Sequence, residues 1–460
     1  MNIRQSFQAL YRRIAASGFL KSVLTLSSGV VMGQGINFLG MPAVGRLYSP
    51  AAMGDYTIII TNASVIMSVA SLGMMTAFML PEKDEEARGL TRLVTLSTLV
   101  ITSLSILGLW ICSGFYRIFH TEEAPYALSL LVLWLYIVLY TISNICYAYV
   151  NRRKLYRVMF WNPIITAGIN VGFGILFGFL GWGFLGYTAA HILSFAANIL
   201  HLIHHANPYE RVSDPAFRCL PLLKSYRRFP VYQMPSNLVA NVGRQIPVQL
   251  MEAVYSSAAL GMYSMAKRIL SLPVSLLATP INRVYFREAS QRYTKGESIG
   301  EFSFKILETN IKIAIAPIAL LIVFGPQIFS IFLGAKWRQA GAYASILGVY
   351  ELMQFCSSCL SGDFVIIRKN FWNLVDAFFD LAIGLFLLIL QEFFVPLSMV
   401  GFLALFSLLS SLKIITFQAI FLRYTGFPLR RYLFFILKYI LIPFALSITL
   451  HILVQGGISL

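Results

Sequence analysis

The sequence predicts an all-α integral membrane protein, with two pseudo-twofold-related six-helix lobes around a central cavity and a thirteenth C-terminal span. Hydrophobic residues make up 58% of the 460 residues, and mean hydropathy is +0.72, far above the values of soluble domains. Apolar runs of about 20 residues, enough to cross a hydrocarbon core of about 30 Å, recur along the whole chain. A short phrase that occurs twice indicates that these runs fall into two related sets.

The apolar runs predict thirteen membrane-spanning helices. They cover residues 20–44, 54–79, 94–116, 127–150, 158–180, 184–204, 230–254, 261–286, 307–333, 343–367, 371–392, 396–420 and 433–454. We expect residues 1–19 to form a cytoplasmic amphipathic N-terminus without a signal peptide, because Arg4, Arg12 and Arg13 precede no short apolar core with a cleavage site. The thirteenth run has no counterpart in a two-lobe scheme, so we expect an appended helix.

The repeated phrase is "YSPAAMGDY" at residues 48–56, which returns 207 residues later as "YSSAALGMY", identical at six of nine positions. It joins spans one and two, and then spans seven and eight. The letters "FWN" open span five and, 211 residues later, span eleven. Because six is even, both lobes are expected to enter the membrane from the same side. The expected parts are an N-lobe at 20–205, a basic cytoplasmic linker at 206–229, a C-lobe at 230–420, and a basic loop with the appended span at 421–460.

The 36 lysine and arginine residues outnumber the 19 acidic residues, and their positions predict topology rather than nucleic-acid binding. Basic clusters such as "RRKLYR" follow the even-numbered spans, whereas most loops after odd-numbered spans carry almost no charge. By the positive-inside rule, the N-terminus is cytoplasmic. The basic clusters would also attract anionic lipid headgroups.

Cysteine and histidine predict no metal or redox site. Cys356 and Cys359 form a CxxC inside an apolar span without nearby ligands, so we expect them to be packing residues. His201, His204 and His205 have a spacing that could hold a metal, but a hydrated helix end explains them better. No Ser-His-Asp, metal or nucleotide motif appears, so we expect a protein that is not an enzyme and has no cofactor.

Polar side chains recur on one face of several spans, and they should face protein or water because they are costly in lipid. The candidates for a substrate-binding surface are Arg244, Arg268, Arg46, Asn37, Gln34, Asn241, Gln245 and Thr61. Hydroxyl stripes alone are more typical of helix packing. An unpaired arginine near mid-bilayer costs about 2.5–3.5 kcal/mol, so Arg244 and Arg268 indicate an anion site. Ion pairs with Glu252 or Asp55 are the structural alternative, and Lys267 is as easily a snorkelling neighbour.

Two acidic residues lie within span eleven. Asp376 and Asp380 are four residues apart in an apolar helix, so they either share a proton or bind a cation. Helix-end solvation explains Asp376 better than Asp380. The candidates for ion coupling are therefore Asp380, Asp376 and Asn237, with H⁺ or Na⁺ as the ion.

Five phrases follow one another in the order and spacing of a known family. They are "RLYSPAAMGDY", "LPEKDEEA", "YRRFPVYQMPSNLVANVGRQIPVQLM", "GMYSMAKRILSLPVSLLATPINRVYF" and "LGAKWRQAGAYA". Together they resemble the Wzx-type polysaccharide (O-antigen) flippases of the multidrug/oligosaccharidyl-lipid/polysaccharide exporter superfamily. The similarity extends over nearly all of residues 20–420, and it rests on the order of the phrases, since no single one is diagnostic.

The resemblance implies a V-shaped pair of lobes that alternates access in the bacterial inner membrane. Its substrate would be an undecaprenyl-pyrophosphate-linked oligosaccharide repeat unit, moved from the cytoplasmic to the periplasmic leaflet for O-antigen (lipopolysaccharide), capsule or exopolysaccharide assembly. A cationic cavity recurs in this superfamily, which implies that Arg244 and Arg268 line it. Some relatives bind a cation in the second lobe, where Asn237, Asn241, Asp376 and Asp380 are the matching candidates. A polysaccharide polymerase and a chain-length regulator are the expected partners, besides membrane lipids. The thirteenth span departs from the family's twelve-helix pattern.

Two other functions remain open. A cation-coupled small-molecule or multidrug antiporter on the same fold would favour an acidic cavity, whereas this sequence places arginine on two stripes. A membrane glycan polymerase or ligase would need an exposed catalytic loop on the periplasmic side, where the longest loop has about a dozen residues.

Overall fold

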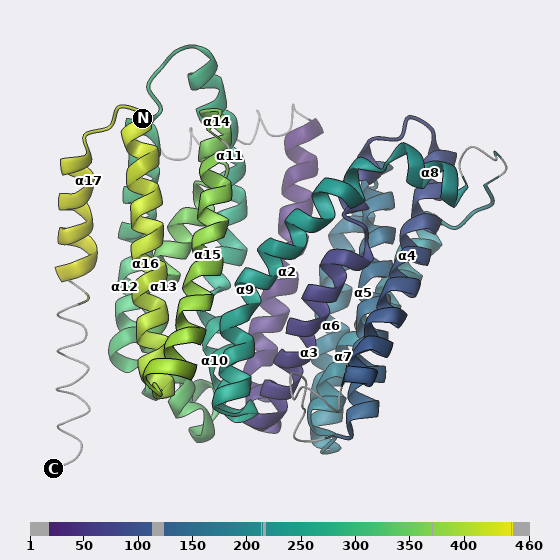
Figure 1. Cartoon of the computed structure of the whole chain (residues 1–460), viewed down its shortest axis with the longest axis horizontal. Coiled ribbons are helices and arrows are strands. Elements are labelled where there is room, and N and C mark those ends of the chain that lie inside the picture. Colours follow the sequence, from purple (N-terminus) through teal and green to yellow (C-terminus); the bar gives the residue numbers. More distant parts are fainter. Residues whose placement is uncertain are drawn as a thin grey trace. The chain divides into compact units, whose positions relative to one another are not determined.

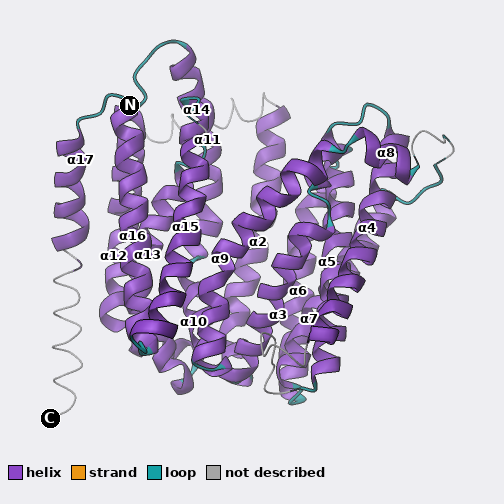
Figure 2. Ribbon diagram, in the orientation of Figure 1, coloured by secondary structure: helices purple, strands orange, loops and turns teal. Residues whose placement is uncertain are grey.

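The computed structural model describes residues 18–112, 124–212, 214, 218–369, 371–442 and 444, which form helices and connecting segments with no strand among them (Figures 1 and 2). Eight of the described helices are long and apolar enough to cross a membrane, so the predicted all-α membrane fold is confirmed. Helices that are shorter or less apolar occupy the expected spans at 20–44, 230–254, 261–286 and 343–367. The predicted N-terminal segment up to residue 17 and most of the second half of the thirteenth span lie outside the described residues.

The chain forms two compact units. Unit 1 draws on Met1–Leu47 and Ile59–Asn241, and unit 2 draws on Tyr48–Ile58 and Val242–Leu460. Two of the three divisions fall inside helices, α3 (Pro50–Ala70) and α9 (Met234–Val254), and the third, between Leu47 and Tyr48, precedes α3. The expected lobe and linker boundaries stay predictions.

Unit 1 is a bundle built around two closely packed helices. Its elements are α2 (Gly18–Leu47), most of α3, the 3-10 helix η1 (Met74–Met79), α4 (Asp84–Cys112), α5 (Tyr126–Arg152), α6 (Tyr156–Phe179), α7 (Gly183–His205), α8 (Cys219–Ser225), the π-helical turn η3 (Phe229–Gln233) and the start of α9. A Cβ on Gly33 of α2 would come within 2.7 Å of the Pro163 carbonyl oxygen in α6, and Gly29 is as tightly placed one turn earlier. These glycines let α2 and α6 approach more closely than side chains would allow.

The start of α4 fixes the segment that precedes α9. The helix begins at Asp84, well before the apolar run, because acidic side chains in a first turn favour the helix dipole. Arg88 forms an ion pair with Glu210, and the Tyr226 hydroxyl donates a hydrogen bond to Glu86 Oε1 at 2.8 Å. Desolvation, together with this carboxylate, raises the pKa of Tyr226 to about 12. The basic segment is therefore anchored to unit 1.

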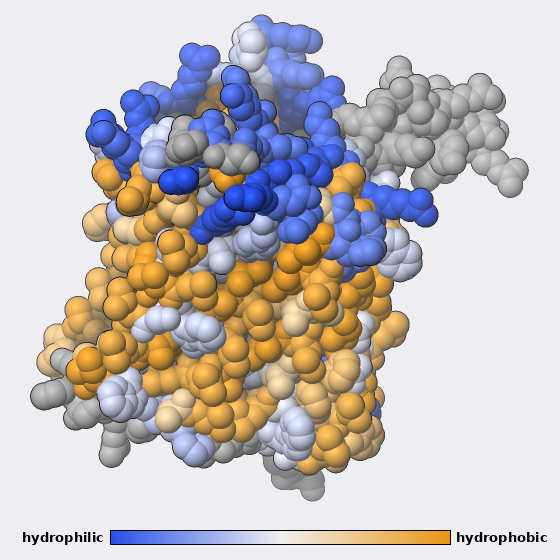
Figure 3. Space-filling view, turned by 90° about the vertical axis from the view of Figure 1, so that its right-hand side faces the viewer, coloured by the Kyte–Doolittle hydropathy of each residue, from blue (hydrophilic) through white to orange (hydrophobic). Residues whose placement is uncertain are grey.

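One face of unit 1 has the polarity expected of a membrane protein. Figure 3 views the right-hand side of Figure 1, where α4 and α8 lie, and shows a broad band of apolar side chains with hydrophilic side chains gathered at one end. Exposed apolar side chains along α4, such as Leu104 and Trp110, belong to such a surface. They suit contact with lipid chains.

Unit 2 contains the remaining helices. They are α10 (Ser257–Leu270), the π-helical turn η4 (Val274–Ala278), α11 (Thr279–Thr294), α12 (Gly300–Leu333), the 3-10 helix η5 (Ala335–Trp337), α13 (Arg338–Cys359), α14 (Asp363–Ile366), α15 (Phe371–Ile389), the π-helical turn η6 (Leu390–Phe394), α16 (Met399–Tyr424), α17 (Leu429–Ile436) and the π-helical turn η7 (Leu437–Leu441). Buried apolar side chains of α12, α13, α16 and α17 form a large core, which includes the thiols of Cys356 and Cys359.

The single span expected at 261–286 is interrupted. Helix α10 ends at Leu270, and a π-helical turn separates it from α11. Pro273 lies at this break, where its missing N–H and its ring oppose a continuous α-helix. The interruption places the end of α10 and the start of η4 beside the cavity described below.

Both copies of the repeated phrase lie in unit 2, and they pack against each other. Gly54 in α3 is so close to Ser257 that a Cβ would overlap the Ser257 carbonyl oxygen, and Gly261 in α10 has the same relation to the Pro50 carbonyl oxygen. The offset of 207 relates residue 54 to 261 and residue 50 to 257, so the contact is reciprocal. Glycine suits both positions because a side chain would force the two helices apart.

The charge alternation makes a testable prediction about topology. In a version with the five native cysteines replaced, we expect Trp182→Cys, on the exposed turn between α6 and α7, to react with a membrane-impermeant thiol reagent in intact cells. Arg157→Cys, exposed in the first turn of α6, should react only after the cells are opened. Labelling of position 157 from outside would reverse the assigned orientation.

Candidate functional site

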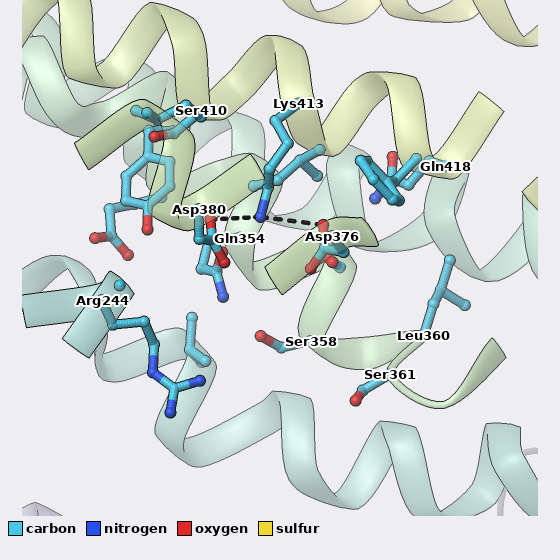
Figure 4. Close-up of a pocket in the computed structure, with 18 of the residues that line it drawn as sticks. Arg244, Gln354, Ser358, Leu360, Ser361, Asp376, Asp380, Ser410, Lys413 and Gln418 are labelled. Carbon is cyan, nitrogen blue, oxygen red and sulfur yellow. Dashed lines mark hydrogen bonds and ion pairs between the residues drawn. The ribbon is translucent and has the colours of Figure 1, made fainter. Parts of the chain in front are cut away.

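Unit 2 encloses a cavity of about 530 Å³ among α9, α10, α13, α15 and α16 (Figure 4). Its volume is within the range of small-molecule sites. Seven charged side chains line it: Arg244, Lys267, Glu351, Asp363, Asp376, Asp380 and Lys413. Amides and hydroxyls complete the polar lining: Tyr263, Ser271, Tyr350, Gln354, Ser357, Ser358, Ser361, Asn373, Ser410 and Gln418. The cavity therefore offers both charges and many hydrogen-bonding groups.

A lysine bridges the two acidic residues of α15. The Lys413 ammonium, from α16, lies 2.6 Å from Asp380 Oδ1 and 3.1 Å from Asp376 Oδ1, as the dashed lines of Figure 4 show. The Lys413 side chain is only 9% exposed, whereas those of Asp376 and Asp380 are 42% and 38% exposed. The ammonium contacts one oxygen of each carboxyl group, and the exposed parts of both groups can accept hydrogen bonds from a ligand.

A second lysine reaches the cavity from α10. The Lys267 ammonium lies 3.4 Å from the Tyr263 hydroxyl and 5.8 Å from the centre of its ring. Glu351 of α13 interacts with it electrostatically and is 3% exposed. The buried Glu351 Oε1 has no hydrogen-bond partner among the described residues. Among the described residues, this wall of the cavity thus holds a half-buried ammonium and a buried acid, with no direct ion pair between them.

Arg244 is the predicted anion-binding residue that reaches this cavity. It projects from α9, well apart from the Asp376–Lys413–Asp380 cluster in Figure 4, and its side chain is exposed. Gly243 precedes it and packs against Leu381 of α15, which keeps the two helices close beside the cavity. Arg268 is half-buried on α10 and does not line the cavity.

The structure distributes the other predicted residues over both units. On α2, Gln34 and Asn37 are half-buried and Arg46 is exposed, while Thr61 of α3 is buried. Asn237 accepts a hydrogen bond from Gln233 Nε2 at 2.9 Å, and Asn241 is half-buried one turn later. These six residues belong to unit 1, and half-buried Gln245 belongs to unit 2. Arg244, Asp376 and Asp380 therefore line one cavity of unit 2, whereas Asn237 belongs to unit 1.

Sequence reasoning missed several residues of the cavity, among them Lys413, Glu351, Gln354 and Ser410. Lys413 is a single charge in "LLSSLKIITF", and Glu351 is a single charge in "GVYELMQF". The rule that selected Asp380, a charge within an apolar span, also selects these two. Gln354 and Ser410 carried no such signal, because one amide or hydroxyl in a span is common. Among the described residues, no group of three or more His, Cys, Asp or Glu side chains could hold a metal ion.

Comparisons with known proteins identify the family. A family model described as polysaccharide biosynthesis protein matches residues 43–342, more than half of the chain. The chain is 21% identical over 327 residues to the succinoglycan biosynthesis transport protein ExoT of Rhizobium meliloti (strain 1021). That match covers 70% of this chain and 64% of ExoT, so the chain spans less than two thirds of this curated relative.

Solved structures share the fold. The lipid II flippase MurJ in an inward closed conformation has a TM-score of 0.68 at 15% identity, over 95% of this chain and 98% of that one. An inward-facing multidrug resistance MATE family transporter of the MOP superfamily has a TM-score of 0.54 at 17% identity, over 88% of this chain and 94% of that one. At such identities the likeness shows a shared fold alone. The family resemblance predicted from the sequence is confirmed: this chain belongs to the polysaccharide biosynthesis protein family.

Proposed function

We propose that the protein is a flippase that moves undecaprenyl-pyrophosphate-linked oligosaccharide repeat units from the cytoplasmic to the periplasmic leaflet by alternating access. It would act in the bacterial inner membrane, with its N-terminus in the cytoplasm, during the assembly of a surface polysaccharide. The family and the names of its similar proteins, a succinoglycan transport protein and a lipid II flippase, support this proposal. A polymerase and a chain-length regulator are proposed partners.

The cavity of unit 2 is the observation that carries the proposal. A pyrophosphate carries charge that hydrocarbon does not solvate, so a carrier must replace its hydration with fixed donors. Arg244 and Lys267 supply cationic donors on the cavity wall, and arginine matches phosphate oxygens with a two-pronged geometry. The polyprenyl tail can remain in lipid throughout.

The remaining polar lining suits sugar hydroxyls. The carboxyl oxygens of Asp376 and Asp380 can accept hydrogen bonds, whereas amides such as Gln354 both donate and accept them. Several such groups around one cavity bind a polyol through many modest interactions, each worth about 0.5–1.5 kcal/mol. A cavity of this size has room for part of the head group, with the rest outside it.

Leaflet-resolved transport in proteoliposomes tests the proposal. We expect the purified protein to move a defined lipid-linked oligosaccharide between leaflets, measured as its time-dependent accessibility to an external glycosidase. Protein-free vesicles and vesicles that carry heat-inactivated protein are the controls.

A cation-coupled small-molecule antiporter is the second candidate, and the four acidic side chains that line the cavity favour it. The same vesicles separate the two functions. Uptake of organic cations without movement of any lipid-linked oligosaccharide would replace the flippase assignment by an antiporter.

A further inference from the structure

We propose that Lys413 is a built-in cation of unit 2, so that Asp376 and Asp380 hold a tethered ammonium in place of a free metal cation. The sequence alone made this acidic pair a candidate for H⁺ or Na⁺ coupling. The structure adds a third member from a different helix. The proposal concerns ion binding by the protein itself and does not depend on the identity of the transported substrate.

The contacts of Lys413 have the geometry of a bound cation. Its ammonium contacts one oxygen of each carboxylate, at 2.6 and 3.1 Å, which are the distances of charge-assisted hydrogen bonds. The lysine is the most buried of the three side chains, while the carboxylates retain exposure toward the cavity. Figure 4 shows the ammonium pointing from α16 into the space that separates the two acids.

Electrostatics explains why such a position needs a positive charge. Two carboxylates one turn apart in an apolar helix repel each other, and without a counter-charge they take up a proton or a cation. A lysine on the same fold has a high effective concentration at this position, because its binding is intramolecular. A free Na⁺ would have to displace the ammonium from the same two oxygens and leave the lysine buried without its partners, which is costly.

The other basic side chains of the cavity lie away from Asp376 and Asp380, so Lys413 is the counter-ion of these two acids. Lys267 of α10 lies near Glu351 of α13 and its ammonium contacts Tyr263, so it is engaged on another wall. Arg244 of α9 also lies apart from the acidic pair in Figure 4. Asp363 of α14 is a fourth acid of the cavity, and no ion pair within 4.0 Å is recorded for it among the described residues. In all, three basic and four acidic side chains line the cavity.

The test compares the thermal unfolding midpoint of the purified protein in chloride salts of Na⁺ and N-methylglucamine at equal ionic strength and pH 7.5. We expect the same midpoint for the natural protein in both salts. Lys413→Ala removes the ammonium between the two carboxylates, so its unfolding midpoint should be lower than that of the natural protein. Na⁺, or ethylammonium as a detached lysine head, should raise it in a dose-dependent way, since a ligand of the folded state stabilises it. Lys413→Arg should behave as the natural protein does.

A matched control removes another lysine ion pair. Lys312 contacts Glu308 at 2.6 Å on α12, but this pair is exposed and holds one carboxylate. Lys312→Ala should therefore show no selective response to Na⁺ or ethylammonium. In the Lys413→Ala background, a further Asp380→Asn change should remove the response, because one of the two ligands is lost.

Two results would overturn the proposal. One is a Lys413→Ala protein whose midpoint is indifferent to both cations, which would make the cluster an ordinary structural ion pair. The other is stoichiometric binding of radioactive Na⁺ to the natural protein that disappears in Asp380→Asn. This second measurement decides the question even if Lys413→Ala does not fold. Neither assay uses an oligosaccharide, so a failed flippase assignment and a failed tethered-cation assignment are distinguishable.

Discussion

Replacing Arg244 with alanine should reduce the initial rate of lipid-linked oligosaccharide translocation about tenfold to 100-fold, with normal expression and an unchanged unfolding midpoint. The range corresponds to the loss of hydrogen bonds to a charged group, worth about 1.5–3 kcal/mol. Arg244 is exposed on the wall of a cavity that has few other cationic donors, so removing it leaves a pyrophosphate poorly neutralised. The rate would be measured in proteoliposomes at saturating and at low substrate.

Three comparison variants test whether the effect depends on the charge, the geometry and the position of Arg244. Arg244→Lys should retain part of the rate, because it keeps the charge but loses the two-pronged geometry. Arg423→Ala removes an exposed arginine at the end of α16, outside the cavity lining, and should transport normally. Arg268→Ala should have a smaller effect on rate than Arg244→Ala, since Arg268 does not line the cavity. Full translocation by Arg244→Ala would remove the anion-binding role.

Substituting either glycine of the repeated phrase should destabilise the protein by about 1–3 kcal/mol, which is typical of overpacking. A Cβ at Gly54 or Gly261 would overlap a backbone carbonyl of the other copy, so the helices must separate. We expect Gly54→Ala and Gly261→Ala each to lower the unfolding midpoint. The double variant should fall short of the sum, because both changes disrupt one contact.

Gly172→Ala is the matched control. Gly172 lies within helix α6, and a Cβ there would meet nothing within 4 Å. Alanine is the better helix former by about 1 kcal/mol, so this variant should keep or raise the midpoint. If Gly54→Ala also kept its midpoint, the close approach of the two copies would not be required for stability.

The helices and their order could be predicted from the sequence, because a long apolar run in a membrane protein forms a helix. Lipid provides no hydrogen bonds to the backbone, so each run must satisfy its own N–H and C=O groups, and an α-helix does this. The π-helical turn after α10 departs from this picture, and Pro273 was its visible signal. Hydropathy does not locate helix ends such as Asp84, because the first turn of α4 consists of charged residues that precede the apolar run.

The site was harder to predict, because it depends on which faces of different helices meet. Helical spacing put Arg268 on a polar stripe, but packing turns Tyr263, Lys267 and Ser271 toward the cavity. Helix α10 also packs through Gly261 against Pro50, more than 200 residues away in the chain, and spacing within the span does not reveal such a contact. The pairing of Lys413 with Asp380 likewise joins two helices, and neither spacing nor composition within one span reveals it.

The reciprocal contact of the repeated phrase obeys the rule of an isologous interface. Residue 54 meets residue 257 while residue 261 meets residue 50, so each contact occurs twice with the partners exchanged. Identical subunits related by a twofold axis generate such pairs, and each subunit then carries both sides of its own interface. When both copies lie in one chain, the contact is preserved, but the sequence of each copy can change independently of the other. Asp55, fully buried in the first copy, corresponds to Met262 in the second, so a single polypeptide holds a difference that a homodimer of identical chains could not.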